Sequence, residues 1–148
     1  MTQAGEWHEG MVQHENAIFV CFGGLSNTGY ITALAGMEAV KRLGLRKASL
    51  FCLAGLPSGV KSVAGKTSAA KKIVTVDGCP MNCARKVVEQ AGFKVDRAIT
   101  LTTDLGVKKV PLHVDLDGEP REPLQYIDQE DVRKASEAII AAVCSTSE

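Results

Sequence analysis

Short apolar runs alternate with helical patterns along most of the chain. The runs are rich in β-branched and aromatic residues and are bounded by glycine or polar residues, which predicts strands. Between them, apolar positions recur three or four residues apart, which predicts helices with one buried face. We expect strands at residues 17–22, 48–53, 73–76 and 97–102, with helices from a cap in 26–28 up to Gly44, over 68–71, over 82–90, and from Asp128 to about residue 143.

This alternation of strand and helix determines the expected fold class. Short connections between strand and helix favour right-handed crossovers, which place helices on both faces of a parallel sheet. We therefore predict an α/β fold: one three-layer domain with a mostly parallel sheet of 4–5 strands, in which the first and third strands lie next to each other or nearly so. The alternating residues 110–116 and the turn signal Asp117-Gly118 supply the fifth strand or a small hairpin. Residues 1–16 are expected to form an N-terminal arm, and residues 17–148 a single α/β metal-binding domain.

The charge and the apolar runs exclude several classes of partner. Seventeen basic and seventeen acidic residues cancel, so no overall field attracts nucleic acid or an anionic membrane. No apolar run approaches the roughly 20 residues that a membrane-spanning helix needs. Residues 1–15 lack the basic-then-apolar order of a secretory signal. These features predict a cytoplasmic protein, in whose reducing environment cysteines bind metal or react more often than they form structural disulfides.

Two cysteines in the run Asp77-Gly78-Cys79-Pro80-Met81-Asn82-Cys83 are the strongest chemical signal. They follow the third expected strand and are expected to lie in the first turn of a helix, where the helix dipole favours the thiolate form. Thiolate is the form that binds a soft metal or attacks a disulfide. Asp77 is interpreted as a residue that hydrogen-bonds the amides of this turn.

Two more cysteines stand at equivalent positions in the pattern. Cys21 ends the first expected strand and Cys52 the second, while Cys79 follows the third. Because the carboxyl ends of parallel strands share one edge, the three sulfurs and Cys83 are expected to converge on one site. The alternative is that each cysteine is a small buried core residue, which is the interpretation we adopt for Cys144.

The same residues resemble those of the DGC-domain family. The likeness rests on Asp77-Gly78-Cys79 with Pro80, on Cys83, on Cys21 before a pair of glycines, and on Cys52, and it extends over roughly residues 17–110. The family consists of small prokaryotic proteins whose four cysteines are thought to bind zinc. The resemblance therefore implies a metal site at Cys21, Cys52, Cys79 and Cys83, and it implies no agreed biochemical role.

Four thiolates suit Zn²⁺ in tetrahedral geometry. Such a site has no open position for an activated water, so the expected function is metal binding rather than catalysis, with a protein partner that exchanges the metal. An iron–sulfur cluster uses the same ligands. A thiol-disulfide oxidoreductase that uses the pair Cys79 and Cys83 is a second alternative, and a small-ligand or nucleotide module at the loop Gly23-to-Gly29 is a third. Lys66, Lys71 and Lys72 are interpreted as a solvated basic face.

Overall fold

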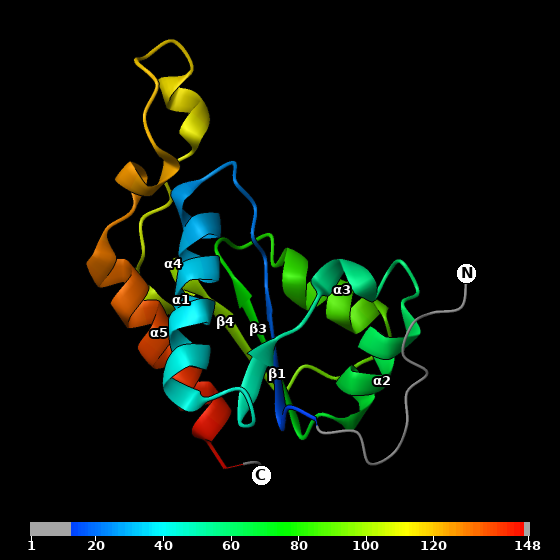
Figure 1. Cartoon of the computed structure of the whole chain (residues 1–148). Helices are drawn as coiled ribbons and strands as arrows, with labels where there is room; N and C mark the ends of the chain where they lie inside the picture. The colour runs from blue at the N-terminus through cyan, green and yellow to red at the C-terminus, as the bar shows by residue number, and fades with distance from the viewer. Residues whose placement is uncertain (1–12, 147–148) are drawn as a thin grey trace.

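The centre of the protein is a parallel sheet (Figure 1). The structure, a computed structural model, describes residues 13–146. The strands are β1 (Asn16–Val20), β2 (Ala48–Leu50), β3 (Lys72–Asp77) and β4 (Arg97–Thr100). They are all parallel and lie in the order β2-β1-β3-β4. The predicted parallel sheet, with the first and third strands adjacent, is confirmed.

Helices cover both faces of this sheet, as Figure 1 shows. On one face lie α1 (Asn27–Leu43) and α5 (Gln129–Cys144), and on the other lie α2 (Lys61–Ala69) and α3 (Cys83–Gln90). The short helix α4 (Leu101–Leu105) continues directly from β4. The chain also contains three short 3-10 helices: η1 (Leu53–Gly55) after β2, and η2 (Leu112–Asp115) and η3 (Pro123–Tyr126) between α4 and α5. The result is the expected three-layer α/β domain.

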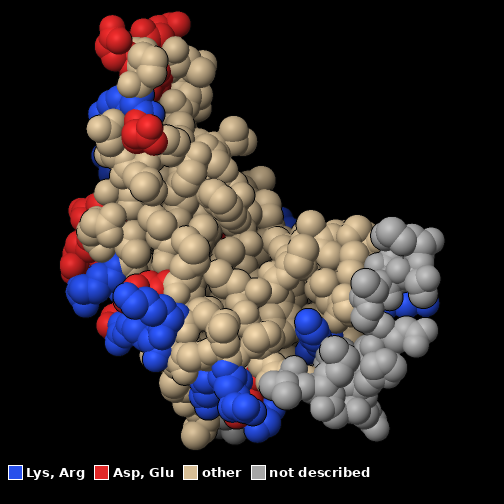
Figure 2. All heavy atoms as spheres, viewed as in Figure 1, with Lys and Arg blue, Asp and Glu red and all other residues tan. Residues whose placement is uncertain are grey.

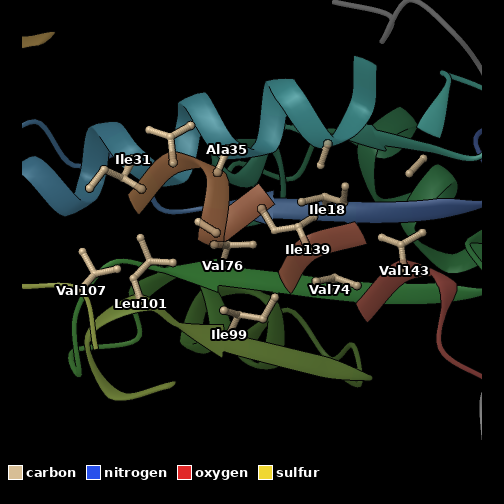
Figure 3. Close-up of a cluster of buried hydrophobic side chains, with 14 residues drawn as sticks. Ile18, Ile31, Ala35, Val74, Val76, Ile99, Leu101, Val107, Ile139 and Val143 are labelled. Carbon is tan, nitrogen blue, oxygen red and sulfur yellow. The ribbon is translucent and has the colours of Figure 1, made fainter. Parts of the chain in front are cut away.

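The alternation of side chains along the strands divides the interior into two cores. Ile18, Val74 and Val76 face α1 and α5, where they pack with Ile31 and Ile139 (Figure 3). The intervening residues face α2 and α3, and this second core consists of Ala17, Phe19, Leu56, Ile73 and Val88. Both sheet faces are therefore buried, which explains why the strands read as nearly continuous apolar runs.

The two long helices begin and end where the sequence predicted. Gly44 follows α1 with φ +89°, a left-handed conformation that glycine adopts without strain. Asp128 precedes α5, and its carboxylate accepts a hydrogen bond from the backbone N–H of Glu130 at 2.9 Å. The helix that was expected over residues 68–71 is instead α2, which begins at Lys61 and ends at Ala69.

Residues 110–116 do not form the strand or hairpin that their alternation suggested. One antiparallel bridge joins Pro111 to Ser26, and η2 begins immediately afterwards. Pro111 has no N–H with which to continue a ladder. The chain from Pro111 to Ile127 instead projects beyond the carboxyl edge of the sheet (Figure 1); we call residues 111–127 the projecting loop.

For two side chains the predicted burial is wrong: Lys72, expected on the surface, is buried, and Cys144, expected in the core, is exposed. Lys72 is only 4% exposed, and its ammonium donates hydrogen bonds to the carbonyls of Ala142 and Val143 at 3.1 and 3.0 Å and to that of Ser145. A cation at the C-terminal end of α5 matches the negative end of the helix dipole, which explains its burial there. Cys144 is exposed, because Val143 takes the inward position on the last turn.

The N-terminal end of the described chain is attached to the domain. His14 places Nδ1 2.5 Å from the carbonyl oxygen of Leu45, and its ring contacts Phe51 edge to face at 5.9 Å. The remainder of the expected N-terminal arm, residues 1–12, lies outside the described residues. None of the helices within residues 13–146 combines the length and the apolar character needed to cross a membrane.

Candidate cysteine site

The candidate site lies where two loops leave the sheet side by side. The connection after β1 goes to β2 on one side and the connection after β3 goes to β4 on the other, so the strand order reverses between β1 and β3. In α/β sheets this switch point, at the carboxyl ends of the strands, is the usual place for a ligand. Cys21 directly follows β1, and Cys79 follows β3 by two residues. We call residues 21–26 the β1 loop and residues 78–82 the β3 loop.

Glycines allow both loops to pack closely against the first turn of α1. A Cβ on Gly78 would lie 2.7 Å from Cβ and Oγ1 of Thr28 and 2.9 Å from its carbonyl carbon. A Cβ on Gly29 would lie 1.8 Å from the carbonyl oxygen of Gly23. Both distances are shorter than a van der Waals contact, so neither position accepts a side chain without movement of backbone. The glycine of the Asp-Gly-Cys run is therefore required by packing.

Asp77 attaches α3 to the end of β3. Its buried carboxylate accepts hydrogen bonds from the backbone N–H groups of Ala84 at 2.7 Å and Arg85 at 3.1 Å. Burial raises the pKa of Asp77, and the two N–H donors and nearby cations offset only part of that effect. This geometry confirms the predicted role in hydrogen-bonding amides at this turn. It also fixes the start of α3, and with it Cys83.

Asn82 separates the two cysteines of the Asp-Gly-Cys segment. It has φ +51° and ψ +46°, the left-handed conformation that asparagine tolerates better than most residues, and α3 begins only after it. Its side-chain oxygen accepts a hydrogen bond from Oγ1 of Thr100 at 2.7 Å, which ties the β3 loop to the end of β4. The expectation that Cys79 lies in the first helical turn is therefore wrong: Cys79 precedes the helix and Cys83 begins it.

Three of the predicted cysteines are brought together. The thiol of Cys21 lies near that of Cys83, with Cys79 and Asp77 close enough for their charges to act on it. Burial raises the pKa of Cys21 to about 11, and the negative charges of Asp77, Cys83 and Cys79 contribute in the same direction. Cys21 and Cys79 are partly buried and Cys83 is exposed. Cys21, Cys79 and Cys83 thus lie near one another at the carboxyl edge between β1 and β3; we call these three residues the thiol cluster.

Cys52 lies apart from this cluster. Phe51 packs against Phe19 on the face that α2 and α3 cover, with ring centroids 5.7 Å apart. Cys52 is exposed before η1, lines a hollow with Phe51 and Val63, and is not among the groups whose charges act on Cys21. Within residues 13–146, no three His, Cys, Asp or Glu side chains are arranged as a ready-made ligand set for a metal ion.

Asn27 is a residue of the site that the sequence did not single out. It is 4% exposed, and its side chain accepts a hydrogen bond from the N–H of Val110 at 2.6 Å and donates one to the carbonyl of Lys108 at 3.0 Å. Its backbone N–H donates to the carbonyl of Val110. Asn27 therefore fastens the base of the projecting loop to the N-terminus of α1. In the sequence it was visible only as one of three candidate caps.

A comparison with protein families agrees with this assembly of loops. The family model described as the DGC domain matches residues 17–139. The chain belongs to the DGC domain family. In this member, the aspartate of the Asp-Gly-Cys run holds α3, the glycine allows the β3 loop to pack against the first turn of α1, and the cysteine lies near Cys21. No curated protein and no solved structure gives a significant match to the chain.

Proposed function

We propose that this DGC-domain protein binds zinc through Cys21, Cys79 and Cys83 and exchanges it at the carboxyl edge of the sheet. The observation that supports the proposal is the gathering of these three thiols at the β1–β3 switch point. Thiolates are preferred ligands of zinc, with bonds of about 2.3 Å. The donor chemistry fits zinc, and small movements of the thiol side chains within the cluster would complete the set. When bound, the metal would supply positive charge that holds the three sulfurs as thiolates.

Cys52 is the proposed fourth ligand. It follows β2, the strand next to β1, and it belongs to the exposed segment that leads into η1. Its participation requires the connection after β2 to move toward the β1 loop. A fourth ligand that arrives by a loop movement would make the site able to open, which suits a protein that passes metal on. The five free cysteines favour a reducing compartment, for which we propose the cytoplasm.

Metal analysis of protein purified without oxygen and without an affinity tag tests this function. We expect about one equivalent of zinc per chain, and titration with Co²⁺ should give the charge-transfer absorption of cobalt bound to thiolate. Serine substitution of Cys21, Cys79 or Cys83 should abolish binding, whereas Cys144→Ser, the matched control at an exposed cysteine outside the cluster, should leave it unchanged. Cys52→Ser should weaken binding if it is the fourth ligand. Full metal content in the Cys79→Ser protein would contradict the proposal.

The nearness of the Cys83 thiol to that of Cys21 favours a second candidate function. In a thiol-disulfide oxidoreductase, these two thiols would form a disulfide and pass two electrons and two protons to a disulfide substrate. The geometry thus favours Cys21 with Cys83, rather than Cys79 with Cys83, as the reacting pair. Turnover of a glutathione-based disulfide by the metal-free protein, lost in Cys21→Ser and retained in Cys79→Ser, would support this function over metal exchange.

A further inference from the structure

Exposed apolar side chains are concentrated at the carboxyl edge of the molecule. Among the described residues, eight large apolar side chains are exposed, and six of them belong to the β1 loop, the β3 loop or the projecting loop. Phe22 and Leu25 belong to the β1 loop, which contains Cys21, and Met81 belongs to the β3 loop, which contains Cys79; Val114, Leu116 and Leu124 belong to the projecting loop. Exposed apolar side chains that gather in one region mark interaction sites. We call this set the apolar rim.

The projecting loop is held in place rather than loosely attached. Leu112 N–H donates to the carbonyl of Leu25 at 2.9 Å, next to the bridge between Pro111 and Ser26. Farther out, the carboxylate of Asp115 accepts hydrogen bonds from Arg121 and Tyr126, and the Arg121 guanidinium lies 4.4 Å from the centre of the Tyr126 ring. These contacts give the loop a defined shape beyond the sheet edge, in which Val114 and Leu116 remain exposed.

The charge of the projecting loop indicates the kind of partner. The loop contains four acidic residues and one arginine, a net charge of −3 in a chain whose total is zero. In residues 13–146, the only ion pair that involves the loop joins Arg121 to Asp115, which leaves Asp117, Glu119 and Glu122 without a cationic partner. Figure 2 shows acidic side chains gathered at the tip of the molecule.

We propose that the apolar rim and the acidic tip together dock a protein partner with an apolar patch bordered by lysine and arginine. The inference rests on the proposed function, because it makes this partner the protein that exchanges zinc with the thiol cluster inside the rim. Complementary charge at the tip would steer and orient the partner, and apolar contacts would hold it. A second copy of this chain would bring an equally acidic loop to the same surface, so like-charge repulsion opposes self-association there.

Site-specific photo-crosslinking in the cells that make the protein tests the surface. A benzophenone amino acid is placed at Leu116, and at Met37 as the matched control, an exposed apolar residue on α1. We expect one protein to crosslink from position 116 and not from position 37. A crosslink only to a second copy, to nucleic acid or to lipid, or no crosslink at all, would overturn the proposal.

Binding of the captured protein, after purification, then decides whether the proposed contacts hold it. Asp117→Lys with Glu119→Lys should weaken binding at least about tenfold and reduce its salt dependence. Leu25→Ser should weaken binding too, whereas Met37→Ser should not. Unchanged affinity in the charge-reversed protein would overturn the docking proposal. Zinc content is measured separately, and the charge-reversed protein should keep its zinc. If the original protein binds the partner but contains no zinc, the proposed function is refuted while the docking surface stands.

Discussion

The close packing of the β3 loop against the first turn of α1 leads to a prediction for Gly78→Ala. The new Cβ would lie 2.7 Å from Cβ and Oγ1 of Thr28 and 2.9 Å from its carbonyl carbon. Thr28 is 1% exposed and its hydroxyl is hydrogen-bonded to that of Ser26 at 2.9 Å, so it has little room to move. The carbonyl carbon is backbone, and no change of rotamer relieves that contact.

Two opposing effects set the size of the change. Overpacking of this kind costs about 1–3 kcal/mol, and the backbone contact places Gly78→Ala in the upper part of that range. Alanine also restricts the unfolded chain, which returns about 0.4–1 kcal/mol. The free energy of unfolding should therefore fall by about 2 kcal/mol. For a domain of this size, that corresponds to a decrease in Tm of about 4–8 °C.

Gly23→Ala is the matched control. Gly23 belongs to the neighbouring β1 loop, and the nearest atom to a Cβ there is Sγ of Cys21 at 4.0 Å, an ordinary contact. This substitution should leave stability unchanged or raise it by up to about 1 kcal/mol. Urea unfolding of the reduced, metal-free proteins, followed by circular dichroism, measures both. If Gly78→Ala were as stable as the original protein, or if the two variants lost stability equally, the packing argument would be refuted.

Three further predictions concern single side chains. Lys72→Met should lower the free energy of unfolding by about 2 kcal/mol, because α5 loses its cationic cap, while exposed Lys71→Met should have little effect in the same urea assay. The hydrogen bonds from Tyr126 and Arg121 lower the pKa of Asp115, so the stability that they give the projecting loop is present above the ordinary pKa and is lost as the pH falls through the lowered one. An NMR titration should show a midpoint below 3.8 that rises in Tyr126→Phe; an unchanged midpoint would contradict this reasoning. In metal-free protein, Cys21 should be the slowest of the five thiols to alkylate, because it is partly buried and its pKa is about 11; equal rates for all five would contradict it.

The sequence predicted the parts of the fold that depend on neighbours along the chain. Apolar runs and their spacing located the four strands and the two long helices. Gly44 and Asp128 marked helix ends because their conformational and hydrogen-bonding preferences act over a few residues. The adjacency of β1 and β3 followed as well, since short right-handed crossovers leave few topologies. The Asp-Gly-Cys run was recognised correctly as a turn at the sheet edge.

Features that depend on contacts between distant segments were decided only by the tertiary structure. Lys72 resembled a surface lysine until α5, more than 50 residues later, supplied carbonyl groups to its ammonium. Asn82 adopts a left-handed conformation in the β3 loop, where Thr100 from the neighbouring strand contacts it, and this moves the start of α3 past Cys79. The alternation at residues 110–116 did not reveal that this segment forms a single bridge with Ser26 instead of a strand.

The cysteines illustrate both what the sequence predicted and what only the tertiary structure decided. Their positions after successive apolar runs placed them at the carboxyl edge, because all strands of a parallel sheet end on the same side. Which of the sulfurs meet depends on the course of the loops that follow the strands. Cys21 lies near Cys83, whereas Cys52 is exposed before η1 and lines a hollow with Phe51 and Val63. Strand order is thus encoded locally, but the approach of Cys21, Cys79 and Cys83 is decided by the packing around Gly78 and Asp77.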